Sequence, residues 1–60
     1  MHKFKKGQIV LVKMDKRELK TKIIGLVEDR LFYFIDWENC GYNKILNTVK
    51  ISEKALSSID

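Results

Sequence analysis

The chain has 60 residues, 45% of them hydrophobic and 33% charged, with a formal net charge of +4 at pH 7. This length allows one domain, expected over residues 1–60, with a small core, because a domain of this size buries only about 60% of its unfolded surface. The composition excludes an intrinsically disordered chain, and no apolar run reaches the roughly 18 to 20 residues that span a bilayer.

The run 8–14, QIVLVKM, is dense in β-branched residues and predicts a first strand. Alternation places three residues on one face of this strand: Val10, Val12 and Met14. Ile9 and Leu11 would then lie on the other face. The polar segment 15–20, DKRELK, predicts a turn or a long loop after the strand.

A second strand is predicted over 21–28, TKIIGLVE, and Gly25 in its middle indicates a bulge or a sharp bend. Asp29 and Arg30 separate this run from the next apolar run. This spacing favours a hairpin with a two-residue connection, although the pair lacks the glycine that such turns prefer. The third strand is expected over 31–36, LFYFID.

The segment 38–43, ENCGYN, predicts a second turn region, in which three residues can take a positive φ: Asn39, Gly41 and Asn43. A fourth strand is expected over 44–51, KILNTVKI. Ser52 is then expected to cap a helical turn over 53–55.

Leu56 would enter the core after this turn, and 57–59 would form a last short strand. Both faces of the first three strands are apolar, which favours a closed or nearly closed barrel over an open sheet. The predicted fold is therefore an all-β, five-stranded SH3-like barrel with a short 3-10 turn before the last strand. A two-sheet fold with a C-terminal helix from Ser52 onward is the alternative.

The stretch 31–42, LFYFIDWENCGY, holds five of the six aromatic residues. Alternation sends Phe32 and Phe34 to one face of the third strand, and Tyr33 and Ile35 to the other. One set fills the barrel, and we expect the phenylalanines to be core residues. Two more aromatic residues follow at the strand end and in the turn, where burial and exposure both stay open: Trp37 and Tyr42.

The six residues 34–39, FIDWEN, resemble the third-strand signature Phe-Ile-Asp-Tyr-Gly-Asn of Tudor domains, a branch of the SH3-like barrels. The resemblance implies an aromatic cage that binds methylated Lys or Arg through cation–π contacts, with Phe34 and Trp37 as cage walls and Asn39 orienting the ligand. The segment 14–24, which would supply the other walls, contains no aromatic residue. The resemblance therefore indicates the fold more than the ligand.

A second resemblance concerns the plasmid-borne dihydrofolate reductases, SH3-like barrels that assemble as tetramers around a shared pore. Residues 49–52, VKIS, correspond to their motif Val-Gln-Ile-Tyr, but Lys50 and Ser52 replace the Gln and Tyr that handle the ligands. The only histidine, His2, and the only cysteine, Cys40, are too few for a metal site. We expect no enzyme, no catalytic residue, no cofactor and no metal.

The favoured function is recognition of a protein partner, as an adaptor or a phage- or mobile-element-encoded inhibitor. An aromatic patch rimmed by charge is typical of small recognition surfaces. The candidate contact residues are Phe34, Asp36, Trp37, Asn39 and Tyr42, with the carboxylates at 36 and 38 selecting a basic partner.

Nucleic-acid binding is the alternative, because a basic loop beside aromatic rings can hold a phosphate backbone and stack bases. Its candidate residues are Lys13, Lys16, Arg17, Lys20 and Lys22. Both hypotheses need the first loop and the aromatic turn to lie near one another. A single cysteine and a basic N-terminus without an apolar run predict a cytoplasmic protein with no membrane contact. Self-association would supplement so small a core.

Overall fold

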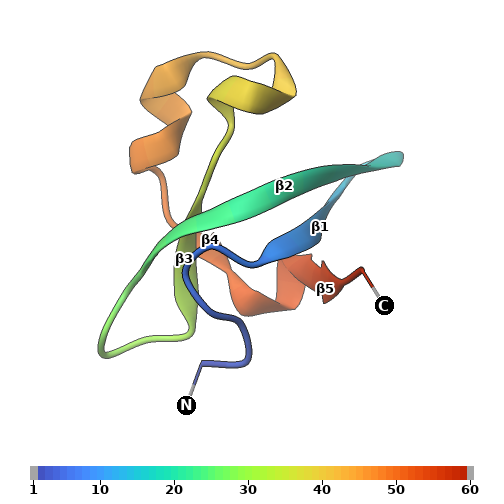
Figure 1. Ribbon diagram of the computed structural model, residues 1–60. Coiled ribbons are helices and arrows are strands. Elements are labelled where there is room, and N and C mark those ends of the chain that lie inside the picture. Colours follow the sequence, from blue (N-terminus) through green and yellow to red (C-terminus); the bar gives the residue numbers. More distant parts are fainter. Residues whose placement is uncertain (1, 60) are drawn as a thin grey trace.

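The computed structural model describes residues 2–59, which form one antiparallel five-stranded sheet curled into a half-barrel (Figure 1). The strands are β1 (Ile9–Met14), β2 (Arg17–Leu26), β3 (Phe32–Ile35), β4 (Ile51–Ser52) and β5 (Leu56–Ser58). The 3-10 turns are η1 (Glu38–Cys40), η2 (Lys44–Thr48) and η3 (Glu53–Ala55). Across the sheet the strand order is β4-β3-β2-β1-β5. The predicted all-β SH3-like barrel is confirmed, and the alternative with a C-terminal helix is wrong.

The strands β1 and β2 form a long hairpin whose pairing runs without a break to a turn at Asp15 and Lys16. Of the two predicted alternatives the turn is confirmed, at Asp15 and Lys16, and the long loop over 15–20 is wrong, since β2 begins at Arg17 rather than at Thr21. The polar residues of this arm extend beyond the core, so they show no apolar alternation that would predict a strand. Pairing with β1 holds them in place.

The core consists of apolar side chains from the N-terminal segment and from β1, β2, β3 and β5: Phe4, Val10, Val12, Ile23, Tyr33, Ile35 and Leu56. Val10 and Val12 are buried on the predicted face of β1, and Val12 lies opposite Leu56 of β5. These positions confirm the alternation predicted for the first strand and the predicted entry of Leu56 into the core.

The buried face of β3 differs from the expectation. Tyr33 and Ile35 are 0% exposed, whereas Phe32 and Phe34 are only half-buried, so the phenylalanines do not fill the barrel. Tyr33 suits this place because its hydroxyl donates to the Glu53 carboxylate and accepts a backbone N–H from the N-terminal segment. A buried phenol needs such partners, and here it finds them at the rim of the core.

The predicted irregularity at Gly25 is confirmed, because the register between β2 and β3 shifts between Ile23 and Gly25. A Cβ atom at Gly25 would lie 3.2 Å from Cδ2 of Phe34. The glycine therefore allows the Phe34 ring to lie against the backbone of β2, where the strand bends.

The connection between β2 and β3 spans 27–31 and is longer than predicted. The Arg30 N–H donates to the Val27 carbonyl at 3.5 Å, so the central turn residues are Glu28 and Asp29. A two-residue connection at Asp29 and Arg30 is therefore wrong, and β2 also stops before Val27.

The expected fourth strand over 44–51 is wrong, because η2 occupies most of this segment and only the short β4 pairs with β3. The side chain of Asn43 accepts the Ile45 N–H at 3.0 Å and so caps η2. Gly41 has the expected positive φ, 89°, whereas Asn39 does not, since no residue of 2–59 other than glycine has one. The turns η1 and η2 lie together at one end of the sheet (yellow and orange in Figure 1).

The tail follows the prediction closely. The Ser52 hydroxyl accepts the Lys54 N–H at 3.3 Å at the start of η3, and β5 begins at Leu56 rather than at Ser57. Within the described residues, no helix has the length and apolar character to cross a membrane.

The Tyr33–Glu53 pair ties the N-terminal segment to the core. The Tyr33 hydroxyl lies 2.5 Å from the Glu53 carboxylate, which also accepts the Lys3 N–H at 3.0 Å. This hydrogen bond lowers the pKa of Glu53 below its usual value. Burial, followed by the same hydrogen bond, raises the pKa of Tyr33.

These shifts predict a stability that falls at both ends of the pH range. The lowered pKa of Glu53 stabilises the fold above the unfolded-state pKa, about 4.3, and this part is lost as the pH falls through the folded-state value. The raised pKa of Tyr33 stabilises the fold below about pH 10, and this part is lost as the pH rises through the folded-state value. Urea unfolding across pH, repeated with Glu53→Gln, measures the acid branch. An unchanged acid branch in the variant would contradict the assignment.

Candidate binding groove

In the described part of the chain, one edge of β2 has no partner strand where β3 turns away, and this stretch is called the open edge below. The strand β3 pairs with β2 only from Ile23 to Leu26, and the last backbone bond runs from the Asp36 N–H to the Lys22 carbonyl at 3.0 Å. The remaining part of β2, 17–21, pairs on its other side with β1. On the side of β3, no strand within residues 2–59 pairs with it.

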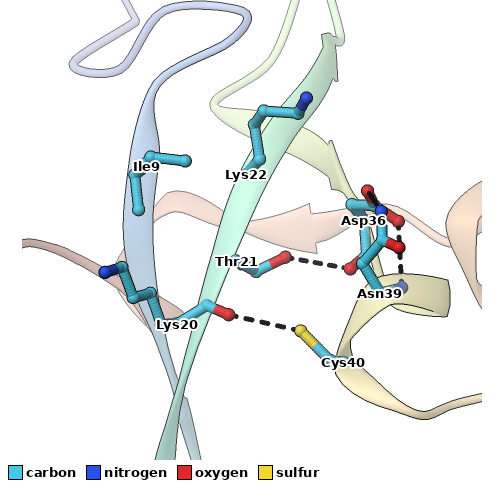
Figure 2. Close-up of a pocket in the computed structure, with 7 residues that line it drawn as sticks. All are labelled: Ile9, Lys20, Thr21, Lys22, Asp36, Asn39 and Cys40. Atoms are coloured by element: carbon cyan, nitrogen blue, oxygen red, sulfur yellow. Dashed lines mark hydrogen bonds between the residues drawn. The ribbon is translucent and has the colours of Figure 1, made fainter.

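A groove of about 250 Å³ lies between this open edge and η1 (Figure 2). Its lining residues are Ile9, Lys20, Thr21, Lys22, Asp36, Asn39 and Cys40. The predicted protein-binding set contributes Asp36 and Asn39, and the predicted nucleic-acid set contributes Lys20 and Lys22. The two candidate sets therefore meet in one place.

Two hydrogen bonds hold η1 against β2. The Thr21 hydroxyl donates to the Asp36 carbonyl at 3.0 Å, and the Cys40 thiol donates to the Lys20 carbonyl at 3.3 Å, as the dashed lines in Figure 2 show. Thr21 is 6% exposed, so its hydroxyl bond is largely shielded from water. Thr21, Cys40 and Ile9 belong to the groove but not to the predicted site, because only their placement in the fold reveals them.

Asp36 and Asn39 are hydrogen-bonded to each other. The Asp36 carboxylate accepts the Asn39 N–H at 3.3 Å and also accepts the Asn39 side-chain amide. Such Asx-type bonds stabilise turns. We therefore assign both residues to the shape of the groove; the Asp36 carboxylate keeps further acceptor sites, so its role in selecting a basic partner stays a prediction.

Asn47 fixes the same turn from the other side. Its side-chain oxygen accepts the N–H groups of Trp37 at 2.7 Å and of Glu38 at 3.2 Å. An isolated asparagine in a run expected to be a strand gives no signal of this role, because its two partners lie about ten residues away in sequence.

Trp37 and Tyr42 are both half-buried and pack against each other edge to face, with ring centroids 5.3 Å apart. Trp37 also packs on the core. The Tyr42 hydroxyl accepts a hydrogen bond from the Arg17 guanidinium and donates to the Met14 sulfur at 3.7 Å. The structure therefore brings the aromatic turn and the arm of the first hairpin together, as both functional hypotheses require.

Phe34 is separate from this pair. It alternates with the buried residues Tyr33 and Ile35, so it faces the other side of β3, where it lies near Gly25. Trp37, in contrast, packs on the core side. The two cage walls implied by the Tudor resemblance are therefore not brought together.

The five predicted nucleic-acid contacts do not share one face. Arg17 lies opposite Met14 on the inner face of the hairpin, whereas Lys20 and Lys22 lie on the outer face opposite Leu11 and Ile9. A third outer residue, Lys13, lies opposite the carboxylate-bearing Glu18, and Lys16 is in the turn. In Figure 2 the Lys22 ammonium extends toward the side of Asp36, while the Lys20 side chain extends away from Cys40.

A second hollow, of about 240 Å³, lies at the β2–β3 connection and is lined by His2, Glu28, Asp29, Arg30 and Leu31. Its charged side chains are exposed and of both signs, so it has no defined chemistry. Among residues 2–59, no group of three His, Cys, Asp or Glu side chains is placed to hold a metal ion.

Comparison with protein-family models, curated proteins and solved structures gives no match for the chain. The fold and the groove define a class nonetheless: a small SH3-like barrel with a preformed groove beside an open strand edge.

Proposed function

We propose that the protein is a small non-enzymatic module that recognises another protein through the groove beside β2. The observation that carries the proposal is the groove itself. One of its walls is the edge of β2, and the other is the η1 turn, which is held by the hydrogen bond from the Asn39 N–H to the Asp36 carboxylate. A wall that is already fixed needs little ordering when a partner binds, which favours recognition.

The size of the groove supports binding over catalysis. Small-molecule and cofactor sites usually measure about 300 to 1,000 Å³ and enclose most of the ligand. A groove of about 250 Å³ on the surface is large enough for one or two side chains of a partner. It contains one carboxylate, Asp36, which is already bonded to Asn39.

A protein partner fits better than a nucleic acid. Stacking of bases requires free ring faces and a continuous basic surface. Trp37 and Tyr42 are half-buried and packed against each other, and the basic residues of the hairpin are divided between two faces. The proposal also includes the cytoplasm as location, because Cys40 is a free thiol, and an adaptor or inhibitor role. The Tudor-like relationship stays a prediction that rests on residues 34–39.

Capture from a lysate of the source organism tests the proposal. Immobilised protein is compared with protein whose single cysteine, Cys40, carries a bulky maleimide that fills the groove. We expect the unmodified protein to capture a partner protein, also after nuclease treatment of the lysate, and we expect the maleimide-blocked protein not to capture it. Circular dichroism should show that the blocked protein stays folded. Retention of nucleic acid alone, weakening steeply with salt, would replace the proposal with nucleic-acid binding.

A further inference from the structure

We infer that the groove receives the carboxylate of an Asp or Glu side chain, carried by an extended segment of the partner protein. This inference rests on the proposed function and names the chemistry of the partner. It follows from the backbone groups of β2, from the acceptors already engaged in the groove, and from the position of Lys22.

The backbone donors of β2 at this edge face the groove. The Lys22 carbonyl accepts the Asp36 N–H, and the Lys20 carbonyl accepts the Cys40 thiol. In an antiparallel strand the N–H and the C=O of one residue point to the same side. The N–H groups of Lys20 and Lys22 therefore also point toward η1, and within the described residues neither donates to 36–40.

The acceptors of the groove, in contrast, are already engaged. The Asp36 carboxylate accepts twice from Asn39, and the Asp36 carbonyl accepts from the Thr21 hydroxyl. Within residues 2–59, the groove therefore presents backbone donors without a partner, whereas each of its acceptors named above already holds at least one hydrogen bond. A ligand that pairs with these backbone N–H groups must supply acceptor oxygens.

The positive charge of the groove favours an anionic acceptor for the Lys22 N–H. Two lysines, Lys20 and Lys22, and one aspartate, Asp36, line the groove, so its side chains are positive on balance, and the chain carries a net charge of +4. Hydrogen bonds to an ionised oxygen are roughly twice as strong as neutral ones. A carboxylate at the groove would accept from the Lys22 N–H, and the excess of lysine over aspartate would favour its charge.

The spacing of the donors selects an extended segment over a free anion. The N–H groups of Lys20 and Lys22 are two strand residues apart, about 6.6 Å at 3.3 Å per residue. One carboxylate or phosphate cannot meet both, whereas a main-chain carbonyl near the acidic side chain can meet the Lys20 N–H. Ile9, which is 42% exposed, adds an apolar wall for a neighbouring side chain of the segment.

A display library of short random peptides, selected on the immobilised protein, tests the inference. We expect the selected peptides to share an Asp or Glu whose change to Asn or Gln weakens binding. Lys22→Gln should weaken binding about two- to fivefold, the range of an exposed ion pair, and the matched variant Lys50→Gln should not. Alkylation of Cys40 should slow when peptide is bound, because the thiol lines the groove.

Each other outcome has a definite meaning. Selected peptides that lack an acidic residue, or that leave the Cys40 alkylation rate unchanged, overturn the inference while the proposed function stands. A failure to select any peptide, with or without binding of single-stranded oligonucleotide, overturns both. Equal weakening by Lys22→Gln and Lys50→Gln shows general charge attraction and overturns the inference alone.

Discussion

Replacing Tyr33 by alanine is expected to leave the protein largely unfolded at room temperature. The side chain is 0% exposed and lies among the largest buried side chains of the core. Truncating a buried aromatic residue costs about 3 to 5 kcal/mol. A chain of this size has a total stability of about 3 to 9 kcal/mol, and so small a domain lies toward the lower end of that range, so the loss removes most of it.

Two matched variants separate the parts of this effect. Tyr33→Phe keeps the ring and removes the hydroxyl that serves Phe4 and Glu53, with an expected loss of about 1 to 3 kcal/mol. Phe32→Ala changes a half-buried neighbour and should cost about 1 to 2 kcal/mol. Urea unfolding followed by circular dichroism measures all three, and a larger loss from Phe32→Ala than from Tyr33→Ala would contradict the core described for β3.

Replacing Asn47 by leucine is expected to loosen η1 and with it the groove. The Asn47 oxygen is the acceptor for the N–H groups of both Trp37 and Glu38. Leucine has a similar size but accepts no hydrogen bond, so the loss should be about 1 to 3 kcal/mol. The Cys40 thiol on η1 should then react faster with an alkylating reagent.

The matched variant is Asn47→Asp, which keeps an acceptor oxygen at the same place. Its carboxylate can accept both N–H groups, so the unfolding free energy and the Cys40 alkylation rate should stay close to those of the wild type. If aspartate and leucine changed both quantities equally, the side-chain oxygen would not be what holds the turn.

The sequence predicted the parts of the fold in which apolar alternation and turn chemistry are local. Val10 and Val12 alternate on β1, Gly25 marks the bulge, and Ser52 caps η3, all as expected. The SH3-like barrel followed from the order of these elements.

The misassigned parts are those decided by distant residues. The arm of β2 from Arg17 is polar, and only pairing with β1 makes it a strand. The apolar residues of η2 suggested a strand, but the bonds of Asn43 and Asn47 hold the segment in turns. On β3, the choice of Tyr33 over the phenylalanines depends on Glu53, about twenty residues further along.

The candidate site was predicted in pieces. Asp36, Asn39, Lys20 and Lys22 were chosen from the sequence for two different functions, and the fold brings them to one groove. The sequence does not predict which polar atoms of the groove lack a hydrogen-bond partner. The Asp36 carboxylate, for example, is hydrogen-bonded to Asn39 in the structure, and no local pattern indicates this bond. The open edge of β2 exists because β3 pairs only with the last part of β2, and no local sequence pattern predicts where this pairing ends.

The most direct test of the account is a two-dimensional ¹H–¹⁵N spectrum of the labelled protein titrated with the captured partner. We predict that the amide signals of Lys20 and Lys22 shift and that their hydrogen exchange slows, because these N–H groups gain acceptors. The main rival surface is η2 and the residue after it, where Ile45 is 67% and Val49 50% exposed. Shifts confined to Ile45 and Val49, with Lys20 and Lys22 unchanged, would contradict the account.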